Sequence, residues 1–511
     1  MENQEKSAHV LAATPQTIRL RGTDEPSCAE AQPTLESRVF GCWLGKSVGG
    51  TLGIPAEGRM ERLHFTYYDP VPTVAPPNDD LELQLVWLCL LERRGFNLTQ
   101  ADFAQAWLNH IHYMWDEYGR CRWNLRRGVP VAEAGTYENP FHAGMGSPIR
   151  SEIWACLCAG KPQAAAQYAA LDASLDHGPE GIAGEVFFAV LQSQVIVGLA
   201  LPKALALALA HIKADTQTAT AIRLVMTRQA GGLETWKCRD ELLSAHDNEN
   251  FTHAPLNVAL TAWALVYGGG DFEKSILLAV NGGYDTDCTA ATVGATLETA
   301  WRREGIPRRW KAPIGEAVYV GQGIRQVSAP VSLSELTNRT LALMRRFRTS
   351  PIQLPDFPRP TGQVDLSRLP GTIRITPTGH MDGAAKALWW ANGELPLEVA
   401  RAGGAAWTWE VGNRVGQPFY LICLAKHGAT LWIDDALVVE CPADLPYVPA
   451  PHRCPPAARA RFLPTKPRHR VRVELAGHGD ASRRVATVLL TASNFHLEPW
   501  TASPLPFAPI L

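Results

Sequence analysis

The sequence PPNDDLELQLVWL, at residues 76–88, is the stretch that decides the fold. Its two prolines cannot continue a helix behind them, Asn78 is a good N-cap, and the apolar run at 81–88 is typical of a buried helix. The pattern predicts a helix whose first turn carries Asp79 and Asp80. Two carboxylates therefore stand at one helix start, where the backbone is free enough to aim both inwards.

A second acidic cluster stands much further along the chain, in GGYDTDC at 282–288. The two glycines give a flexible turn, and the small residues AATVGA at 290–295 predict a helix packed closely against its neighbours. Asp285 and Asp287 stand at the start of that helix. If the fold brings the two helix starts together, four carboxylates converge, and so much negative charge is tolerable only when cations neutralise it.

A divalent-metal site follows from this pattern. Oxygen ligands without His or Cys at zinc-like spacing favour magnesium, manganese or calcium. The simpler alternative is that the acids only cap their helices and complement the helix dipoles, each contributing roughly 0.3–1 kcal/mol. Capping needs one acid for each helix, whereas this chain supplies two at each start, which favours the metal.

Length and composition exclude several classes of protein. The 511 residues are too many for one ordinary core, and a net charge of −2 argues against partners bound by electrostatics, such as nucleic acid or a membrane surface. The 11 cysteines lack framework spacing, which indicates a reducing compartment. The N-terminus lacks the apolar segment of a signal peptide, and no stretch is long enough to cross a bilayer. We expect a cytoplasmic protein.

The chain divides by composition into four parts. Residues 1–35 are polar and predict a disordered leader, and residues 36–348 form an all-α domain of Ala- and Leu-rich runs. Its last helix begins at a capping box, Ser332-Leu333-Ser334-Glu335. Residues 349–371 hold five prolines and predict a linker. The clearest helical runs are at 163–171, 182–199, 201–212 and 256–266.

Beyond the linker, residues 372–511 favour strands. The apolar period switches towards two, and Asp434-Asp435 suits a hairpin turn. Several short strands of this kind usually form a β-sandwich, so a β-sandwich domain is predicted here. The expected strands lie at 406–411, 419–424, 430–433, 471–475 and 485–490.

The paired acidic clusters resemble the two metal-binding motifs of the ADP-ribosylglycohydrolases, Thr-Asp-Asp early and Asp-x-Asp-Thr/Ser late. The resemblance covers nearly the whole helical part of the chain and none of the C-terminal part. It implies an all-α hydrolase that uses two Mg²⁺ or Mn²⁺ ions. The metal ligands that it implies are Asn78, Asp79, Asp80, Asp285, Asp287 and Cys288.

Three further segments are similar to that family. GKSVGGTLGIPAE at 45–57 resembles its opening helix and loop, which implies Glu57 as an active-site carboxylate, and Glu57 or Asp80 as the general acid or base. GMGSPIR at 144–150 resembles its glycine-rich loop around phosphates or ribose, and Asp176-His177 resembles a Thr-His pair in the same pocket. The implied substrate-binding residues are Gly144, Gly146, Ser147 and His177. The blander alternatives are an ordinary turn and a structural histidine.

Four positions depart from the family pattern, one of them Met145, where some members have asparagine. Asn78 stands where the family has threonine, Cys288 where it often has threonine or serine, and Gly50 where many members have aspartate. Asn78 still offers an oxygen, whereas a thiol is a poorer partner for a hard ion. The resemblance therefore implies a divergent branch that acts on a related ribosyl or other glycosidic bond.

Three functions remain open from the sequence. The first is metal-dependent hydrolysis of an N- or O-glycosidic bond in a small-molecule or ADP-ribosylated substrate. The second is a catalytically inactive, ADP-ribose-binding or structural relative. The third is a catabolic glycosidase of a glycan without ADP-ribose, in which the C-terminal domain binds carbohydrate. The tryptophans of that domain can stack on sugars or fill its core, and they are Trp389, Trp390, Trp407, Trp409 and Trp432.

Overall fold

A computed structural model gives the structure of the chain. In the helical part it describes residues 34–354 except 114, 127 and 301–304. The predicted leader and most of the predicted linker lie outside the described residues. In the C-terminal part the described segments are 364–365, 373–378, 388–390, 406–412, 415–416, 418–425, 427–443, 445, 455–476 and 486–491, some of them through the backbone alone.

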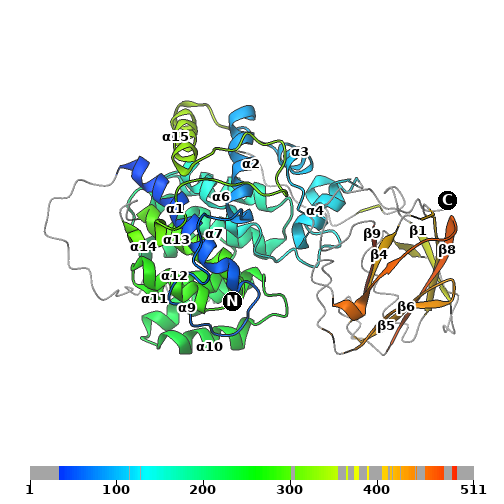
Figure 1. Cartoon of the computed structure of the whole chain (residues 1–511). Coiled ribbons are helices and arrows are strands. Elements are labelled where there is room, and N and C mark those ends of the chain that lie inside the picture. The colour runs from blue at the N-terminus through cyan, green and yellow to red at the C-terminus, as the bar shows by residue number, and fades with distance from the viewer. Residues whose placement is uncertain are drawn as a thin grey trace, which may run out of the picture.

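The helical part is an all-α domain, as predicted (Figure 1). None of the helices described in it combines the length and the apolar character that crossing a bilayer needs. The longer elements are α1 Leu35–Gly53, α2 Asp79–Arg94, α3 Gln100–His110, α4 Asp116–Arg126, α6 Pro162–Ala173, α7 Pro179–Val195, α8 Leu201–Leu209, α9 Gln217–Ala230, α10 Thr235–His246, α11 Ala254–Gly268, α12 Phe272–Asn281, α13 Thr286–Ala300 and α15 Leu333–Thr349. The shorter ones are α5 Glu152–Leu157, α14 Arg308–Lys311 and the 3₁₀ turn η1 Ile54–Ala56.

The predicted helical runs correspond to α6, α7, α8 and α11, but two of the runs extend too far. Helix α7 ends at Val195, and Gly198 follows it with φ of +92°, a left-handed conformation that favours glycine and turns the chain. The capping box of α15 is half formed. Ser332 Oγ accepts the Glu335 N–H at 3.1 Å, while the Glu335 carboxylate accepts the N–H of Val331 instead of that of Ser332.

Helices α1 and α13 pack backbone against backbone, which explains the glycines of the 45–57 motif. A Cβ built on Gly45 would lie 2.3 Å from the carbonyl oxygen of Gly294, and one on Gly49 would lie 2.0 Å from that of Ala290. Only glycine fits at such distances. The close contact predicted for the small residues at 290–295 is confirmed, and it places the start of α13 beside the end of α1.

The C-terminal part forms two antiparallel sheets. One has the strand order β2-β1-β3-β8-β5-β6 and the other β7-β4-β9. The turn that joins β5 to β6 is Asp434-Asp435, with φ of +49° and +67°, as suits a two-residue hairpin. The strands are β1 Ile373–Thr378, β2 Leu388–Trp390, β3 Ala406–Gly412, β4 Phe419–Ala425, β5 Ala429–Ile433, β6 Ala436–Cys441, β7 Arg459–Phe462, β8 Arg468–Leu475 and β9 Ala486–Thr491.

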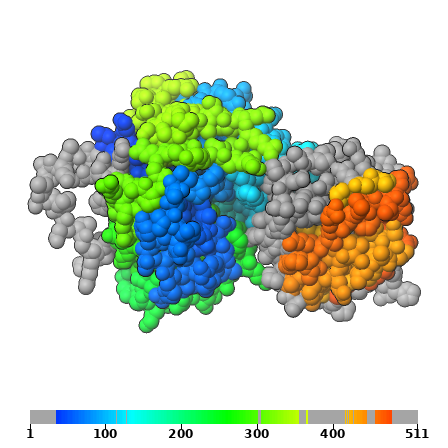
Figure 2. Space-filling view, viewed as in Figure 1, coloured from blue at the N-terminus to red at the C-terminus, as the bar shows by residue number. Residues whose placement is uncertain are grey.

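The strand predictions for β3, β4, β5, β8 and β9 are confirmed, and β1, β2, β6 and β7 were missed. The packing of the two sheets as a sandwich stays a prediction. Figure 2 shows the helical part from the same side, with the segment between α1 and α2 in blue at its front and the yellow-green segment that leads into α15 above it. Both segments contribute residues to a pocket beside Asp80: Ala75 and Pro76 from the first, and Ala317, Val318 and Tyr319 from the second.

Candidate metal centre

The start of α2 is built as the sequence predicts. Asn78 is its N-cap, because the Asn78 Oδ1 accepts the backbone N–H of Asp80 at 2.7 Å. The Asn78 amide nitrogen donates across to the Asp287 carboxylate, at 3.4 Å. One side chain therefore joins the two helix starts, and the predicted convergence of the acidic clusters is confirmed. The Asn78 oxygen, predicted as a metal ligand, is used in the cap.

The start of α13 is held from two sides. Gly283 and Tyr284 turn the chain with φ of +76° and +68°. Thr286 Oγ1 then donates to the carbonyl oxygen of Gly53 at 2.8 Å, and the Asp285 N–H donates to the Asn257 side chain of α11 at 3.2 Å. These contacts fix Asp285 and Asp287 next to the end of α1.

Two groups of side chains are arranged as metal ligands are. Asp80, Asp287 and Cys288 each offer one ligand atom within 4.8 Å of the other two, and so do Glu57, Asp285 and Asp287. Asp287 belongs to both groups. Asp79 belongs to neither; it is half-buried, and its Oδ2 accepts the Tyr118 hydroxyl at 3.1 Å. We call Glu57, Asp79, Asp80, Asp285 and Asp287 the acidic centre.

The donor atoms of the acidic centre fit a cation. Asp80 Oδ2 and Asp287 Oδ1 are buried, and neither has a hydrogen-bond partner within the described part of the chain. A buried carboxylate oxygen without a donor is costly, and a bound cation removes that cost. Because Asn78 already caps α2, capping does not explain the Asp80 side chain, and the ion pair with Lys46 uses only its Oδ1.

The raised pKa values of the acidic centre also favour a bound cation. Burial raises the pKa of Asp80 well above its ordinary value, although Lys46 opposes the rise. The pKa of Asp285 is also raised well above its ordinary value, by burial and by the charge of Asp287. The pKa of Asp287 is raised to about 8 by burial and by the charges of Glu57 and Asp79. Carboxylates that resist ionisation in this way become good ligands once a divalent ion is near.

Cys288 is less suited to the role that the family resemblance implies. Its thiol is buried, and burial together with the neighbouring aspartates raises its pKa well above the ordinary value. The thiol therefore stays protonated at neutral pH, and a protonated thiol is a poor ligand for a hard ion.

Lys46 is a residue that the sequence reasoning missed. Its ammonium group is 1% exposed and lies 3.3 Å from Asp80 Oδ1 and 3.2 Å from the Glu152 carboxylate. Gln84 donates to the other side of Glu152 at 2.8 Å. The lysine thus holds one oxygen of Asp80 and leaves the other for a ligand. The available signal was a charged residue inside a glycine-rich, otherwise apolar helix.

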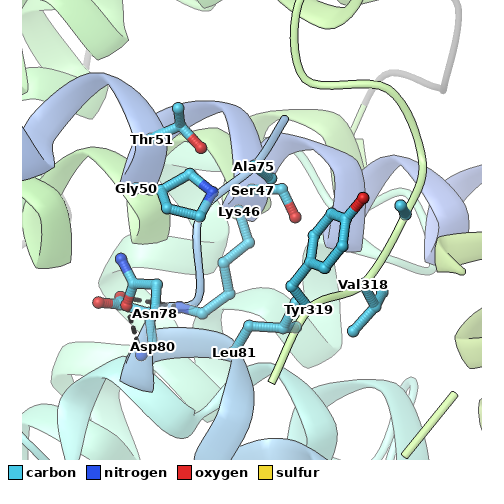
Figure 3. Close-up of a pocket in the computed structure, with 12 residues that line it drawn as sticks. Lys46, Ser47, Gly50, Thr51, Ala75, Asn78, Asp80, Leu81, Val318 and Tyr319 are labelled. Carbon is cyan, nitrogen blue, oxygen red and sulfur yellow. Dashed lines mark hydrogen bonds and ion pairs between the residues drawn. The ribbon is translucent and has the colours of Figure 1, made fainter. Parts of the chain in front are cut away.

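A pocket opens beside Asp80 (Figure 3). Lys46, Asn78 and Asp80 line its inner end, and Tyr319, from the segment before α15, lines it from the other side. It encloses about 390 Å³ of empty space, part of which is open to solvent. Tyr319 is 47% exposed, so an aromatic ring stands at the mouth of the pocket.

The segment 144–150 and His177 lie next to the acidic centre, as predicted. The Gly146 N–H donates to Glu117 Oε1 at 2.9 Å, and the neighbouring Tyr118 donates to Asp79. His177 Nε2 lies 3.4 Å from Glu117 Oε1 and 3.3 Å from the Ser147 nitrogen. Glu117 and Tyr118, in the first turn of α4, were missed; the signal was the polar run WDEYG at 115–119.

Behind this segment lies a second group of buried charges, which we call the Arg150 cluster: Arg150, Asp172, Asp176, His177 and Glu185. The Arg150 guanidinium donates to Asp172 at 2.9 Å and to Asp176 at 2.6 Å. Burial opposes charge here, yet Arg150 and His177 lower the pKa of Asp176 to about 2, and Asp176 and Glu117 raise the pKa of His177 to about 9. These side chains form internal ion pairs.

Comparison with known proteins gives a family match over the helical part. The sequence pattern of the ADP-ribosylglycohydrolase family matches residues 31–347. An uncharacterized protein of Archaeoglobus fulgidus is 26% identical over 293 residues, which cover 54% of this chain and 91% of that protein. A solved structure described as an ADP-ribosylglycohydrolase-related protein complex aligns with a TM-score of 0.44 and 23% identity, over 61% of this chain and 98% of the other.

Proposed function

The chain belongs to the ADP-ribosylglycohydrolase family, and from this premise we propose that it is a divalent-metal-dependent hydrolase of an N- or O-glycosidic bond in an ADP-ribosyl or related glycosyl substrate. The observation that carries the proposal is the pair of buried oxygens, Asp80 Oδ2 and Asp287 Oδ1, that no described group satisfies. They face a shared space at two joined helix starts.

Asp80, Asp285 and Asp287 are the ligands that we propose for Mg²⁺ or Mn²⁺, with Glu57 and Asp79 beside them. The two ligand groups share Asp287. Without the Cys288 thiol, the first group offers Asp80 and Asp287 to one ion, and the second offers Asp285 and Asp287 to another, with Glu57 beside it. When bound, such ions orient the vicinal hydroxyls of a sugar and lower the pKa of a water molecule.

Glu57 is the better of the two predicted general bases. It is exposed at the end of η1, and its carboxylate lies within 4.8 Å of ligand atoms of Asp285 and Asp287, so it can reach both water and substrate. One oxygen of Asp80 is instead held by the Lys46 ammonium at 3.3 Å. We assign Glu57 to proton transfer and Asp80 to metal binding.

The departures from the family pattern leave the carboxylates of the acidic centre in place. A Cβ built on Gly50 would lie 3.0 Å from the Asn78 amide nitrogen, so asparagine at 78 fills the space that a larger residue at 50 would need. Carbohydrate binding by the C-terminal part stays a prediction; the Arg472 guanidinium lies 4.1 Å from the centre of the Trp432 ring, and the side chains of the other four tryptophans lie outside the description.

The test is a panel of N- and O-ribosides, with ADP-ribosyl-arginine and ADP-ribosyl-serine peptides among them, incubated with Mn²⁺ or with EDTA. We expect sugar release from at least one substrate with Mn²⁺ only, and none from Asp80→Ala combined with Asp285→Ala. Asp271→Asn is the matched control, because Asp271 starts helix α12 as a cap, accepting the Lys274 N–H at 2.7 Å. Release that persists in EDTA contradicts the proposal, and Mn²⁺ binding without any release supports the inactive alternative.

A further inference from the structure

The segment 144–147 has few backbone amides to offer a phosphate. A phosphate-binding loop presents successive N–H groups to its ligand. Here the Gly144 N–H donates to the carbonyl oxygen of Phe141 at 2.7 Å, and the Gly146 N–H donates to Glu117 Oε1 at 2.9 Å. The Ser147 amide is covered by the His177 ring, 3.3 Å from Nε2. Residues 144–150 are buried throughout.

The glycines of this segment make room for a carboxylate of the chain itself. A Cβ on Gly144 would lie 2.6 Å from Glu117 Oε2, and one on Gly146 would lie 2.4 Å from Glu117 Oε1. Both distances are shorter than any van der Waals contact, so both positions need glycine as long as Glu117 is there. The pattern that resembles a phosphate-binding loop thus surrounds an anion that is already present.

Glu117 places a carboxylate next to the acidic centre. It is 4% exposed, and its Oε2 has no hydrogen-bond partner among the residues described. Its charge helps to raise the pKa of Asp79, which places it within electrostatic reach of the acidic centre. A phosphate group entering beside Asp79 would meet this carboxylate at short range, and like charges at short range repel.

Three buried cations nearby are already paired with carboxylates. Lys46 pairs with Asp80 and Glu152. Arg150 donates to Asp172 and Asp176, and His177 lies between Asp176, at 2.8 Å, and Glu117 itself, at 3.4 Å. A diphosphate binds where arginine, lysine or free amides converge, and these cations are already neutralised.

We infer that Glu117 excludes phosphate from this site and that the substrate is a phosphate-free glycoside. The sugar presents vicinal hydroxyls to the acidic centre, and the group next to Glu117 is uncharged or cationic. The inference rests on the proposed function, because it names the substrate class of the same site. Glu117 acts as a specificity-determining residue through its charge and its hydrogen bond to Gly146.

The experiment compares a phosphate-free riboside with its 5-phosphate and with ADP-ribose. Methyl β-D-ribofuranoside, its 5-phosphate and ADP-ribose are titrated into the full chain at constant free Mn²⁺, and each dissociation constant is measured by calorimetry. The proteins are the wild type, Glu117→Gln and Glu241→Gln. The last variant removes one negative charge from an exposed ion pair with Arg228 on α10 and α9, away from the site.

The wild type is expected to bind the plain riboside at least about tenfold more tightly than either phosphorylated ligand. Glu117→Gln keeps an oxygen that can accept the Gly146 N–H but removes the carboxylate charge. It should therefore reduce the preference for the plain riboside over the phosphorylated ligands by about tenfold. Glu241→Gln should leave this preference unchanged. A wild type that binds ADP-ribose or the 5-phosphate as tightly as the riboside, or that binds Mn²⁺ but none of the three ligands, overturns the inference. The wild-type comparison decides even if Glu117→Gln does not fold.

Arg120 supports the main alternative, in which the site binds phosphate. Its Nη2 is buried without a partner in the described structure, so Arg120 is a cation that a phosphate could use. Phosphate-dependent binding that disappears in Arg120→Met refutes the inference and identifies that cation.

The Mn²⁺ titration distinguishes failure of the proposed function from failure of the phosphate exclusion. A wild type that binds no Mn²⁺ refutes the proposed function, whereas one that binds Mn²⁺ and prefers phosphorylated ligands refutes only the phosphate exclusion.

Discussion

The acidic centre and the Arg150 cluster both bury several carboxylates in one helical domain, but they balance the charge differently. The Arg150 cluster contains its own cations, Arg150 and His177, and the pKa of Asp176 falls to about 2, although burial raises the pKa of Asp172 and of Glu185. Among the described residues the acidic centre has Lys46 as its cation, which it shares with Glu152, and the pKa of Asp287 rises to about 8.

This difference separates a structural cluster from a binding site. Burial opposes ionisation in both places, so burial alone does not identify a function. Unsatisfied carboxylate oxygens occur in both regions, because Glu185 Oε1 and Oε2 lack hydrogen-bond partners just as Asp80 Oδ2 and Asp287 Oδ1 do. What distinguishes the acidic centre is that its carboxylates share a single described cation, Lys46, which also pairs with Glu152. A folded protein tolerates such a shortage of cations where an external cation supplies the balance.

Asp80→Asn should have the largest effect. It removes a proposed metal ligand, and turnover should fall on the order of 10³-fold or more, which corresponds to about 4 kcal/mol in the activation free energy. The metal-free protein should lose little stability, because burial already disfavours the Asp80 charge and Lys46 keeps Glu152 as its partner. Steady-state kinetics measure the loss of turnover, and urea unfolding in EDTA measures the stability of the metal-free protein. Full activity would show that the shortage of donors at Asp80 has no functional meaning.

Arg150→Met should have the next largest effect, on stability. It leaves Asp172 and Asp176 buried without their cation, and breaking a buried pair in this way costs roughly 3–5 kcal/mol of the free energy of unfolding. Urea unfolding measures the loss. The control is Arg228→Met, which breaks an exposed pair with Glu241 and should cost less than about 1 kcal/mol. Equal losses would mean that the Arg150 cluster is not held by its internal pairs.

The two regions should respond to pH in opposite directions. Asp287 has a pKa raised to about 8 in the folded state, so its contribution to the stability of the metal-free protein is present below about pH 4 and is lost as the pH rises towards 8. Asp176 has a pKa lowered to about 2, so its contribution is present above about pH 4 and is lost as the pH falls towards 2.

The raised pKa of Asp287 also predicts how Mn²⁺ affinity depends on pH. The ion must displace the proton of Asp287, whose pKa is about 8, so affinity should rise by up to about tenfold per pH unit between pH 6 and 8. Calorimetric titration at several pH values measures this slope. An affinity that is independent of pH over that range would place the metal away from Asp287.

Tyr319→Ala should have the smallest effect. The ring stands at the mouth of the pocket beside the acidic centre, and loss of an aromatic contact typically removes about 0.5–1.5 kcal/mol of binding. KM should therefore rise roughly two- to twelvefold with kcat little changed. Val331→Ala, at a 74% exposed position before α15, is the control on the same segment. An unchanged KM would leave the pocket without a role in substrate binding.

The fold of the helical part was predictable because its signals are local. Prolines, Asn78 and the apolar run that follows fix the start of α2, and the small residues at 290–295 already indicate a close helix contact. Strands β2 and β7 were missed because they have only three and four residues, and β1 because it contains Pro377 and follows the proline-rich segment closely.

The candidate site was predictable only in part. Which aspartate of a pair is buried depends on packing, and Asp80 is 1% exposed while Asp79 is half-buried beside Tyr118. Lys46 and Glu152 are 106 positions apart, and no local pattern connects them. The glycines at 144 and 146 were interpreted by resemblance, because the Glu117 carboxylate that they surround comes from another element.

The central claim is that the acidic centre binds a divalent cation, and Mn²⁺ binding followed by electron paramagnetic resonance tests it most directly. Wild-type protein should take up Mn²⁺ saturably, and Asp80→Asn combined with Asp287→Asn should weaken the binding by roughly 100-fold or more while the protein still unfolds cooperatively in EDTA. Equal Mn²⁺ uptake by the wild type and the folded double variant would contradict the account.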